Sequence, residues 1–287
     1  MPSDARFQLC RRVFGVSEAL FQKGMRRVTL ITWIGRQVLA FFASLGAFAL
    51  YGAHMARGIF RGRWQWHDFI DHMDRIGVGS LFMVTVTSAF SGMVMAVQTL
   101  DQFIRFGATQ YVGGVIALTM IREMAPVLTG LVVTGRVGAA MAAEIGTMNV
   151  TEQLDALRAF GIDHVAFVGT PRLLASAIML PVLTVFSFAV SVGGACLYVT
   201  NHGISDFVFR RSVSVMVHHI DLMGGLVKAL TFGILIAISS CTEGFRAENG
   251  ARGVGFATTR AVIWSNMLIL VFNYIISSIF FGDFFRG

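Results

Sequence analysis

The sequence predicts an all-α integral membrane protein, with an N-terminal interfacial helix followed by five transmembrane helices. Of the 287 residues, 55% are hydrophobic and only 14% are charged, whereas soluble domains carry about 25% charged residues. The apolar residues come in runs of about twenty or more, the length that crosses about 30 Å of hydrocarbon. These runs are apolar on all sides, which excludes a membrane β-barrel built from short alternating strands.

The N-terminal part of the chain is basic. Residues 1–32 form a segment predicted to lie in the cytoplasm, and the stretch at about 33–57 is predicted to be a helix at the membrane surface. Its apolar run, Val38 to Ala53, is short for a span and has arginines on both sides. If it crossed, one basic cluster would lie outside, against the positive-inside rule. A cleaved signal peptide ending at Ala49 is the alternative, which the long basic region before the run disfavours.

Five longer apolar runs follow, and each predicts a transmembrane helix. Arg122 and Glu123 interrupt the second run. Pro171 and Pro181 are expected to break the third, because proline removes a backbone donor. The predicted spans cover about residues 77–100, 112–146, 164–200, 222–241 and 261–281.

Positive charge predicts the orientation of these spans. Starting from a cytoplasmic N-terminus, five crossings place residues 147–163 and 242–260 in the cytoplasm and the C-terminus outside. Most of the 23 lysines and arginines then lie on the cytoplasmic side, as the positive-inside rule requires. Membrane topology therefore accounts for the net charge of +7, and no nucleic-acid partner is needed to explain it.

Small residues recur every four positions in the second span. Such spacing lets helix backbones approach closely in lipid. Packing within one subunit fits the pattern, and so does a face shared with a second copy of the chain. The candidate packing residues are Gly135, Gly138, Ala139, Ala142 and Gly146.

Arg122 and Glu123 lie about ten residues into the second predicted span. Ionised side chains inside a membrane are costly, so both should face a protein interior or a wet cavity. They could form a structural ion-pair network between helices, or they could line a substrate path. Lys228, in the fourth span, lies close enough to a helix end to extend its amine to the membrane surface.

The loop between the second and third spans predicts a short amphipathic helix. Asn149 and Glu152 fit a capping box, and Gly161 suits the position just after the helix. The helix could rest on the membrane surface, which its spacing slightly favours, or dock into a groove of a soluble partner. Its apolar side holds Leu154, Leu157 and Phe160, and Glu152, Asp155 and Arg158 supply charge.

Several kinds of active site have no motif in this sequence. There is no P-loop for ATP, no zinc-protease or serine-hydrolase motif and no cysteine–histidine cluster for a metal. Cys10, Cys196 and Cys241 lie far apart and are expected to be free thiols. The sequence therefore disfavours an enzyme within the membrane, and we expect no cofactor in this chain.

The sequence resembles the MlaE (YrbE) family of permeases in ABC transporters that work with MCE-domain proteins, over about residues 33–283. The middle block of the resemblance is long and of unusual composition. The matching motifs are REMAP (Arg122–Pro126), GRVGAAMAAEIGTM (Gly135–Met148), VTEQLDAL (Val150–Leu157), PR (Pro171–Arg172) and GVGFATTRAV (Gly253–Val262).

The resemblance implies a homodimeric permease with an N-terminal elbow helix, located in the bacterial inner membrane. Its expected partners are a cytoplasmic MlaF-type ATPase that binds ATP and Mg²⁺, an MlaD-type ring of MCE-domain proteins on the outer face, and in some systems a STAS-domain protein. Phospholipid transport that maintains membrane asymmetry is the implied function. Val150–Phe160 resembles the coupling helix that inserts into the ATPase. Arg122 and Glu123 resemble a polar pair near the lipid cavity at the dimer centre.

One position departs from the family pattern. Many family members carry an aspartate in the last span where this chain has Asn273. The amide can still hydrogen-bond across helices, but it cannot supply a titratable acid. Two rival functions stay open on the sequence alone: a structural membrane anchor of an envelope complex, and an ion-coupled secondary transporter.

Overall fold

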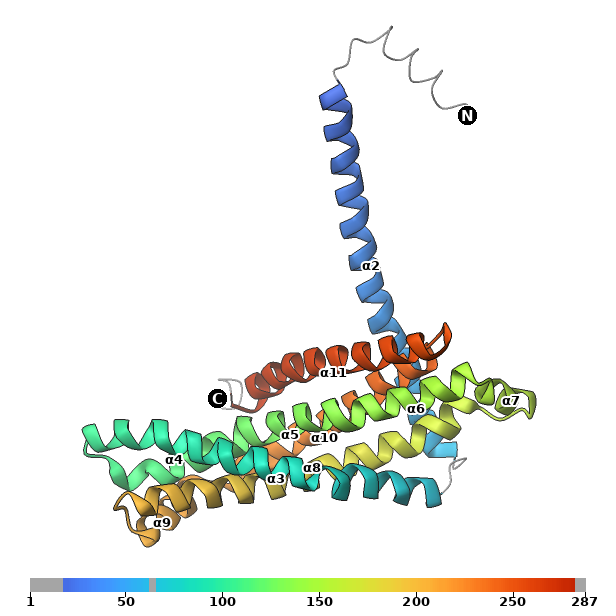
Figure 1. Cartoon of the computed structure of the whole chain (residues 1–287). Coiled ribbons are helices and arrows are strands. Elements are labelled where there is room, and N and C mark those ends of the chain that lie inside the picture. Colours follow the sequence, from blue (N-terminus) through green and yellow to red (C-terminus); the bar gives the residue numbers. More distant parts are fainter. Residues whose placement is uncertain (1–17, 62–65, 282–287) are drawn as a thin grey trace, which may run out of the picture. The chain divides into compact units, whose positions relative to one another are not determined.

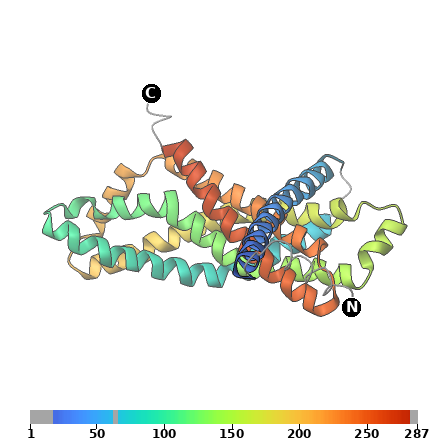
Figure 2. The same ribbon diagram turned by 90° about the horizontal axis from the view of Figure 1, so that it is seen from above.

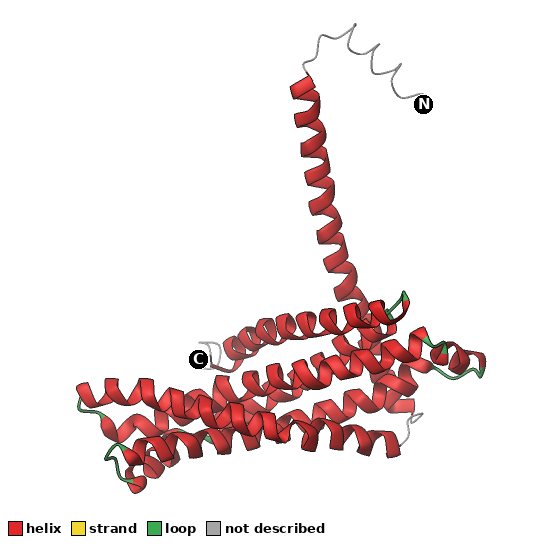
Figure 3. Cartoon of the chain, in the orientation of Figure 1, coloured by secondary structure: helices red, strands yellow, loops and turns green. Residues whose placement is uncertain are grey.

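The described residues, 18–61 and 66–281, form helices joined by short loops in a computed structural model of the chain (Figure 3). It divides into two compact units, residues 1–50 and 51–287, with the boundary inside helix α2 (Glu18–Arg61). Six helices of the described part are long and apolar enough to cross a membrane. The predicted class, an all-α membrane protein, is confirmed.

Helix α2 runs without interruption through the predicted interfacial region at 33–57. Within it, Gly35–Ile59 is 25 residues long and has the length and composition of a membrane span. The expectation that this segment is too short to cross is therefore wrong, because the helix continues beyond its apolar run. The interfacial position stays a prediction that rests on the flanking arginines.

The five predicted spans are all helices, and each extends beyond its apolar run. The first is α3 (Trp66–Arg105), and the third, fourth and fifth are α8 (His164–Asn201), α10 (His219–Phe245) and α11 (Gly250–Phe281). Within residues 51–287, α8 packs along both α3 and α10, while α11 packs along α10 and α6 (Figures 1 and 2). A short helix, α9 (Asp206–Met216), packs on α4 at the end of the bundle opposite α7.

The second span is a chain of short helical segments. It consists of η1 (Thr109–Tyr111), α4 (Val112–Thr119), η2 (Met120–Met124), α5 (Ala125–Val133), η3 (Thr134–Gly138) and α6 (Ala139–Val150). Both η2 and η3 are π-helical turns. Such turns shift the side chains that follow and often occur at functional sites. Here η2 contains the charged pair Arg122 and Glu123.

Helix α8 continues through both of its prolines, so the predicted break in the third span is wrong. A proline costs one backbone hydrogen bond, and membrane helices tolerate this loss when neighbouring helices enclose them. Pro171 is buried, and α8 packs between α3 and α10. Gly92 of α3 shows how closely the helices approach: a Cβ there would lie 2.0 Å from the Ser191 carbonyl oxygen.

Two groups of small residues in the second span have different surroundings. A Cβ on Gly138 would lie 3.0 Å from Ser240 Oγ, one on Gly146 would lie 3.1 Å from the Ala247 Cβ, and Ala142 is fully buried. These three residues therefore pack within the subunit, against α10, α11 and the turn between them. Gly135 is exposed, with nothing within 4 Å of a Cβ, and Ala139 is half-buried. Packing within one subunit therefore does not explain why position 135 holds a residue as small as glycine.

Candidate functional site

The candidate site is a polar network that joins η2 to α10 and α11. Pro126 has no N–H and cannot donate to the carbonyl of Arg122, four residues earlier. Lys228 of α10 bonds to that carbonyl through its Nζ at 2.6 Å. The same Nζ lies 2.8 Å from Glu123 Oε1 and 2.6 Å from Ser277 Oγ. Its three donor hydrogens thus have three acceptors.

Glu123 is the centre of this network. Its Oε1 accepts from Lys228 and also from Ser277 Oγ at 2.8 Å. Its Oε2 accepts from the Asn273 amide at 2.9 Å. The side chain of Lys228 is 0% exposed, while that of Glu123 is 37% exposed. One side chain therefore ties α10 and α11 to the second span and stays partly exposed at the subunit surface.

Arg122 extends to the start of α10. Its Nε and Nη2 contact Asp221 Oδ1, at 2.7 and 2.6 Å. The other carboxylate oxygen of Asp221 accepts from the His218 backbone N–H at 2.9 Å, and the two residues form a capping box. Asp221 therefore stabilises the first turn of α10 and fixes that turn against η2.

The three residues predicted for the substrate path lie together. The structure shows an ion-pair network between helices. This network is one of the two roles that the sequence left open for Arg122 and Glu123. The expectation that Lys228 reaches the membrane surface is wrong, since its amine is enclosed by Glu123, Ser277 and the Arg122 carbonyl. Lys228 lies in an apolar run, and a cation there indicates that an acidic partner lies on a neighbouring helix.

A second ionic cluster, missed in the sequence, joins α3, α6 and α8. Glu144 Oε2 lies 2.8 Å from Arg172 Nη2, and its Oε1 lies 3.3 Å from Arg75 Nη1. Arg172 is buried and also donates to the Val168 carbonyl at 2.7 Å. Glu144 and Arg172 belong to two of the sequence motifs, but only the fold brings them together. The cluster braces α6 and α8, the two helices that flank α7 in the chain.

The predicted amphipathic helix is α7 (Gln153–Ala159). The predicted capping box at Asn149 and Glu152 is wrong, because α6 continues to Val150 and includes Asn149. The Asn149 amide donates instead to the carbonyls of Phe245 and Ala247, at 3.3 and 2.8 Å. Glu152 precedes α7 with a left-handed φ of 62° and makes no side-chain cap.

The end of α7 follows the prediction. Gly161 has a φ of +72°, and its N–H bonds to the Arg158 carbonyl at 2.9 Å. The Ile162 N–H bonds to the Leu157 carbonyl at 3.0 Å. This pair of hydrogen bonds is the Schellman motif, which needs the left-handed residue that glycine supplies.

The predicted apolar side of α7 divides into a buried and an exposed part. Leu154 is buried and Leu157 packs beside it, in a core cluster that includes Met55 and Phe245. Phe160 is 81% exposed. Asp155 and Arg158 form an exposed ion pair at 2.8 Å. The exposed surface of α7 and its C-cap therefore includes Phe160 and this charged pair, beside the exposed Gln153, Ala156 and Ala159.

Asp163 holds the chain as it leaves α7 and enters α8. Its Oδ1 accepts from the Ala166 backbone N–H at 3.3 Å, and its Oδ2 lies 2.7 Å from His54 Nε2. Partial burial opposes ionisation of this carboxyl group, but the bond from Ala166 and the nearby His54 together lower its pKa below the ordinary value. Asp163 thus joins the start of α8 to α2.

No group of His, Cys, Asp and Glu side chains that could hold a metal ion occurs among the described residues. Cys241 is buried and Cys196 is half-buried, and both are free. Cys10 lies outside the described residues.

Comparison with known proteins identifies the family. The family model described as "Permease MlaE" matches residues 69–279. A probable ABC transporter permease of Synechocystis is 40% identical over 256 residues, covering 89% of this chain and 94% of the relative. The intermembrane phospholipid transport system permease protein MlaE of Haemophilus influenzae is 32% identical over 262 residues, covering 89% and 98%.

A plant relative is also similar. Protein TRIGALACTOSYLDIACYLGLYCEROL 1, chloroplastic, of Arabidopsis thaliana is 37% identical over 230 residues, covering 78% of this chain and 64% of the relative. In ABC transporters of this kind the permease is a non-catalytic subunit, and ATP hydrolysis takes place in separate partner chains. The matches cover nearly all of the bundle, from α3 to α11. The chain is a multi-pass membrane protein and belongs to the MlaE permease family of ABC transporters.

Proposed function

We propose that this permease moves phospholipid or a related lipid between the inner membrane and the outer membrane or cell envelope, and so helps to maintain lipid asymmetry. The observation that carries the proposal is the polar network at η2, in a chain whose Haemophilus relative is named for intermembrane phospholipid transport. The side chains of Glu123 and Arg122 are each partly exposed at the subunit surface. A charged edge on a membrane helix needs a polar or wet neighbour, which a headgroup in a cavity provides.

The proposed assembly is a homodimer with the N-terminus in the cytoplasm and the C-terminus in the periplasm. The exposed Gly135 and the half-buried Ala139 support a close helix contact with a second copy. The expected lipid cavity lies between the two copies. An MlaD-type MCE ring on the outer face, and a STAS-domain protein in some systems, complete the expected set of partners.

The proposed ATPase contact is α7. Phe160 and the Asp155–Arg158 pair are among its exposed groups, which suits insertion into a groove of an MlaF-type partner holding ATP and Mg²⁺. Helices α6 and α8 flank α7 and are joined by the Glu144–Arg172 ion pair. A movement of the ATPase bound at α7 would therefore displace both helices together. Displacement of α6 would reach the network at η2, because α5 and η3 connect them.

The test is lipid movement by the complete complex in proteoliposomes. The chain co-purified with its ATPase should transfer fluorescent phospholipid to acceptor vesicles in the presence of ATP and Mg²⁺. Glu123→Gln should reduce transfer per assembled complex. Transfer by the chain alone without ATP would contradict the proposal and favour an ion-coupled transporter. Full transfer by the Glu123→Gln complex would contradict the role of the network.

A further inference from the structure

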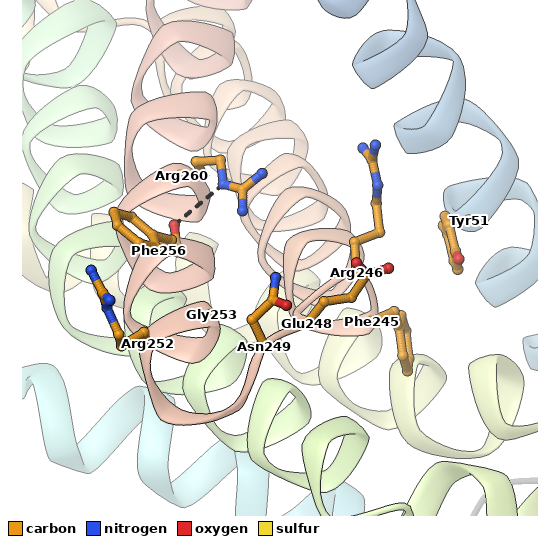
Figure 4. Close-up of a pocket in the computed structure, with 9 residues that line it drawn as sticks. All are labelled: Tyr51, Phe245, Arg246, Glu248, Asn249, Arg252, Gly253, Phe256 and Arg260. Carbon is orange, nitrogen blue, oxygen red and sulfur yellow. Dashed lines mark hydrogen bonds between the residues drawn. The ribbon is translucent and has the colours of Figure 1, made fainter.

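A pocket of about 730 Å³ lies at the turn between α10 and α11, away from the polar network (Figure 4). Residues 51–287 supply all of its lining. Phe245 and Tyr51 form one wall as stacked rings, with centroids 5.7 Å apart and planes at 12°. Arg246 and Asn249 come from the turn, and Phe256 and Arg260 come from α11.

The turn that forms this pocket has a closely defined backbone. Asn249 and Gly250 both adopt left-handed conformations, with φ of 65° and 67°. Asparagine is one of the few residues other than glycine that adopt this conformation readily. A Cβ on Gly253 would lie 1.4 Å from the Glu248 carbonyl oxygen, so only glycine fits there. The turn is also hydrogen-bonded to α6 through the Asn149 amide, at the Ala247 carbonyl.

The polar groups in the pocket are mainly cationic. Figure 4 shows the guanidinium groups of Arg246 and Arg260 on one side of α11, and that of Arg252 on the other side in this view. Arg260 lies 3.7 Å from Glu243, whose side chain is 3% exposed. Arg246 is exposed and has no ion pair or side-chain hydrogen bond among the described residues. Among the described residues that line the pocket, Glu248 is the one acid.

The pocket lies where the headgroups of a bilayer would be. Both α10 and α11 have the length and composition of membrane spans, and the turn connects their ends. The 31 residues of the α11 span rise about 46 Å at 1.5 Å per residue, more than the hydrocarbon thickness of about 30 Å. α11 is therefore long enough for its first turns, which carry Arg252, to extend beyond the hydrocarbon. Phe256, 59% exposed on α11, is placed to contact acyl chains.

We propose that this pocket binds a phosphate group of a lipid headgroup, at the end of the bundle near α7. Guanidinium groups bind phosphate oxygens through short, charge-assisted hydrogen bonds. Arg246 is available for such bonds, and the printed contacts of Arg260 are long, 3.7 Å to Glu243 and 3.5 Å to the Phe256 carbonyl. The position at the headgroup level favours a lipid over free phosphate as the source of the group. The site is separate from the network of the proposed transport path and does not depend on it.

The experiment measures binding by the full chain in detergent, by titration followed by native mass spectrometry. The probes are dihexanoyl phosphatidic acid, dihexanoylglycerol and inorganic phosphate. The decisive variant is Arg246→Gln, which changes an exposed residue without an ion pair in the described part of the chain. The matched control is Arg211→Gln, an exposed arginine on α9 at the opposite end of the bundle. Arg260→Lys is a second variant that keeps a positive charge beside Glu243.

Phosphatidic acid should bind more tightly than dihexanoylglycerol, and Arg246→Gln should raise its Kd roughly ten-fold, the effect of one charge-assisted hydrogen bond. Arg260→Lys should weaken binding less, since lysine keeps the charge and loses the bidentate fork. Inorganic phosphate binding as tightly as the lipid, and weakened by Arg246→Gln, would support the phosphate site and make free phosphate its source.

Three outcomes would overturn the proposal. These are an unchanged Kd in Arg246→Gln, an equal loss in Arg211→Gln, and equal affinity for dihexanoylglycerol. Loss of a co-purifying ATPase in Arg246→Gln at unchanged lipid affinity would also overturn it, in favour of a protein-docking role. Because binding is measured without transport, a failure here is distinct from a failure of the proposed function.

Discussion

Replacing Lys228 with methionine removes the cation at the centre of the η2 network. Methionine has a similar length and no charge, so the core volume is nearly kept. The change leaves Glu123 with two neutral donors, Asn273 and Ser277, and leaves the Arg122 carbonyl without its 2.6 Å bond from Lys228. Both losses occur at a side chain that is 0% exposed.

The expected loss of stability is about 3 kcal/mol. Removing one partner of a buried ion pair costs about 3–5 kcal/mol, because the other charge stays behind unpaired. The lower end of this range applies here, since the Glu123 side chain is 37% exposed and solvent or a neighbouring polar group screens its charge. The double variant Lys228→Met/Glu123→Gln removes both charges, so it should be more stable than Lys228→Met alone. The coupling between the two positions should exceed about 1 kcal/mol.

The assay is the free energy of unfolding in mixed micelles, obtained by titration with a denaturing detergent. Arg211→Met is the control, because it removes an exposed arginine on α9. An unfolding free energy of Lys228→Met equal to that of the unmodified chain would contradict a stabilising role of the ion pair. Such a role would also be contradicted if Glu123→Gln fails to restore stability to the Lys228→Met chain.

Further predictions concern four other places. Gly92→Ala should destabilise the α3–α8 contact by about 1–3 kcal/mol in the same titration, because its Cβ would meet the Ser191 carbonyl, whereas Gly193→Ala, with nothing within 4 Å, should not. Phe160→Asp should abolish co-purification of the ATPase at unchanged membrane insertion; unchanged ATPase recovery would disprove the α7 contact. Arg172→Gln should lower ATP-driven lipid transfer more than ATPase binding, and equal losses of both would contradict a bracing role. The lowered pKa of Asp163 means that its stabilising effect is present above its unfolded pKa and is lost as pH falls through the folded value. Asp163→Asn should therefore show a weaker acid destabilisation in pH-dependent melting, and identical curves would contradict this.

The sequence by itself determined the class of protein and the number and order of the long helices after residue 65. Apolar runs longer than a bilayer is thick leave the backbone no alternative to helix, since its polar groups must be satisfied within the segment. The end of α7 at Gly161 was also predictable, because only a left-handed residue closes that helix. These features depend on local physics.

Tertiary structure decided which charged residues meet. Glu123 and Lys228 are 105 residues apart in the chain, and Glu123 and Asn273 are 150 apart, so no local spacing relates them. The predicted cap at Asn149 does not form, because the Asn149 amide donates to carbonyls at the α10–α11 turn. The prolines of α8 do not break this helix, because neighbouring helices enclose it. In a membrane every buried polar group needs a polar partner. The sequence shows which polar residues lie in the spans, but only the packing of the helices determines which residues pair.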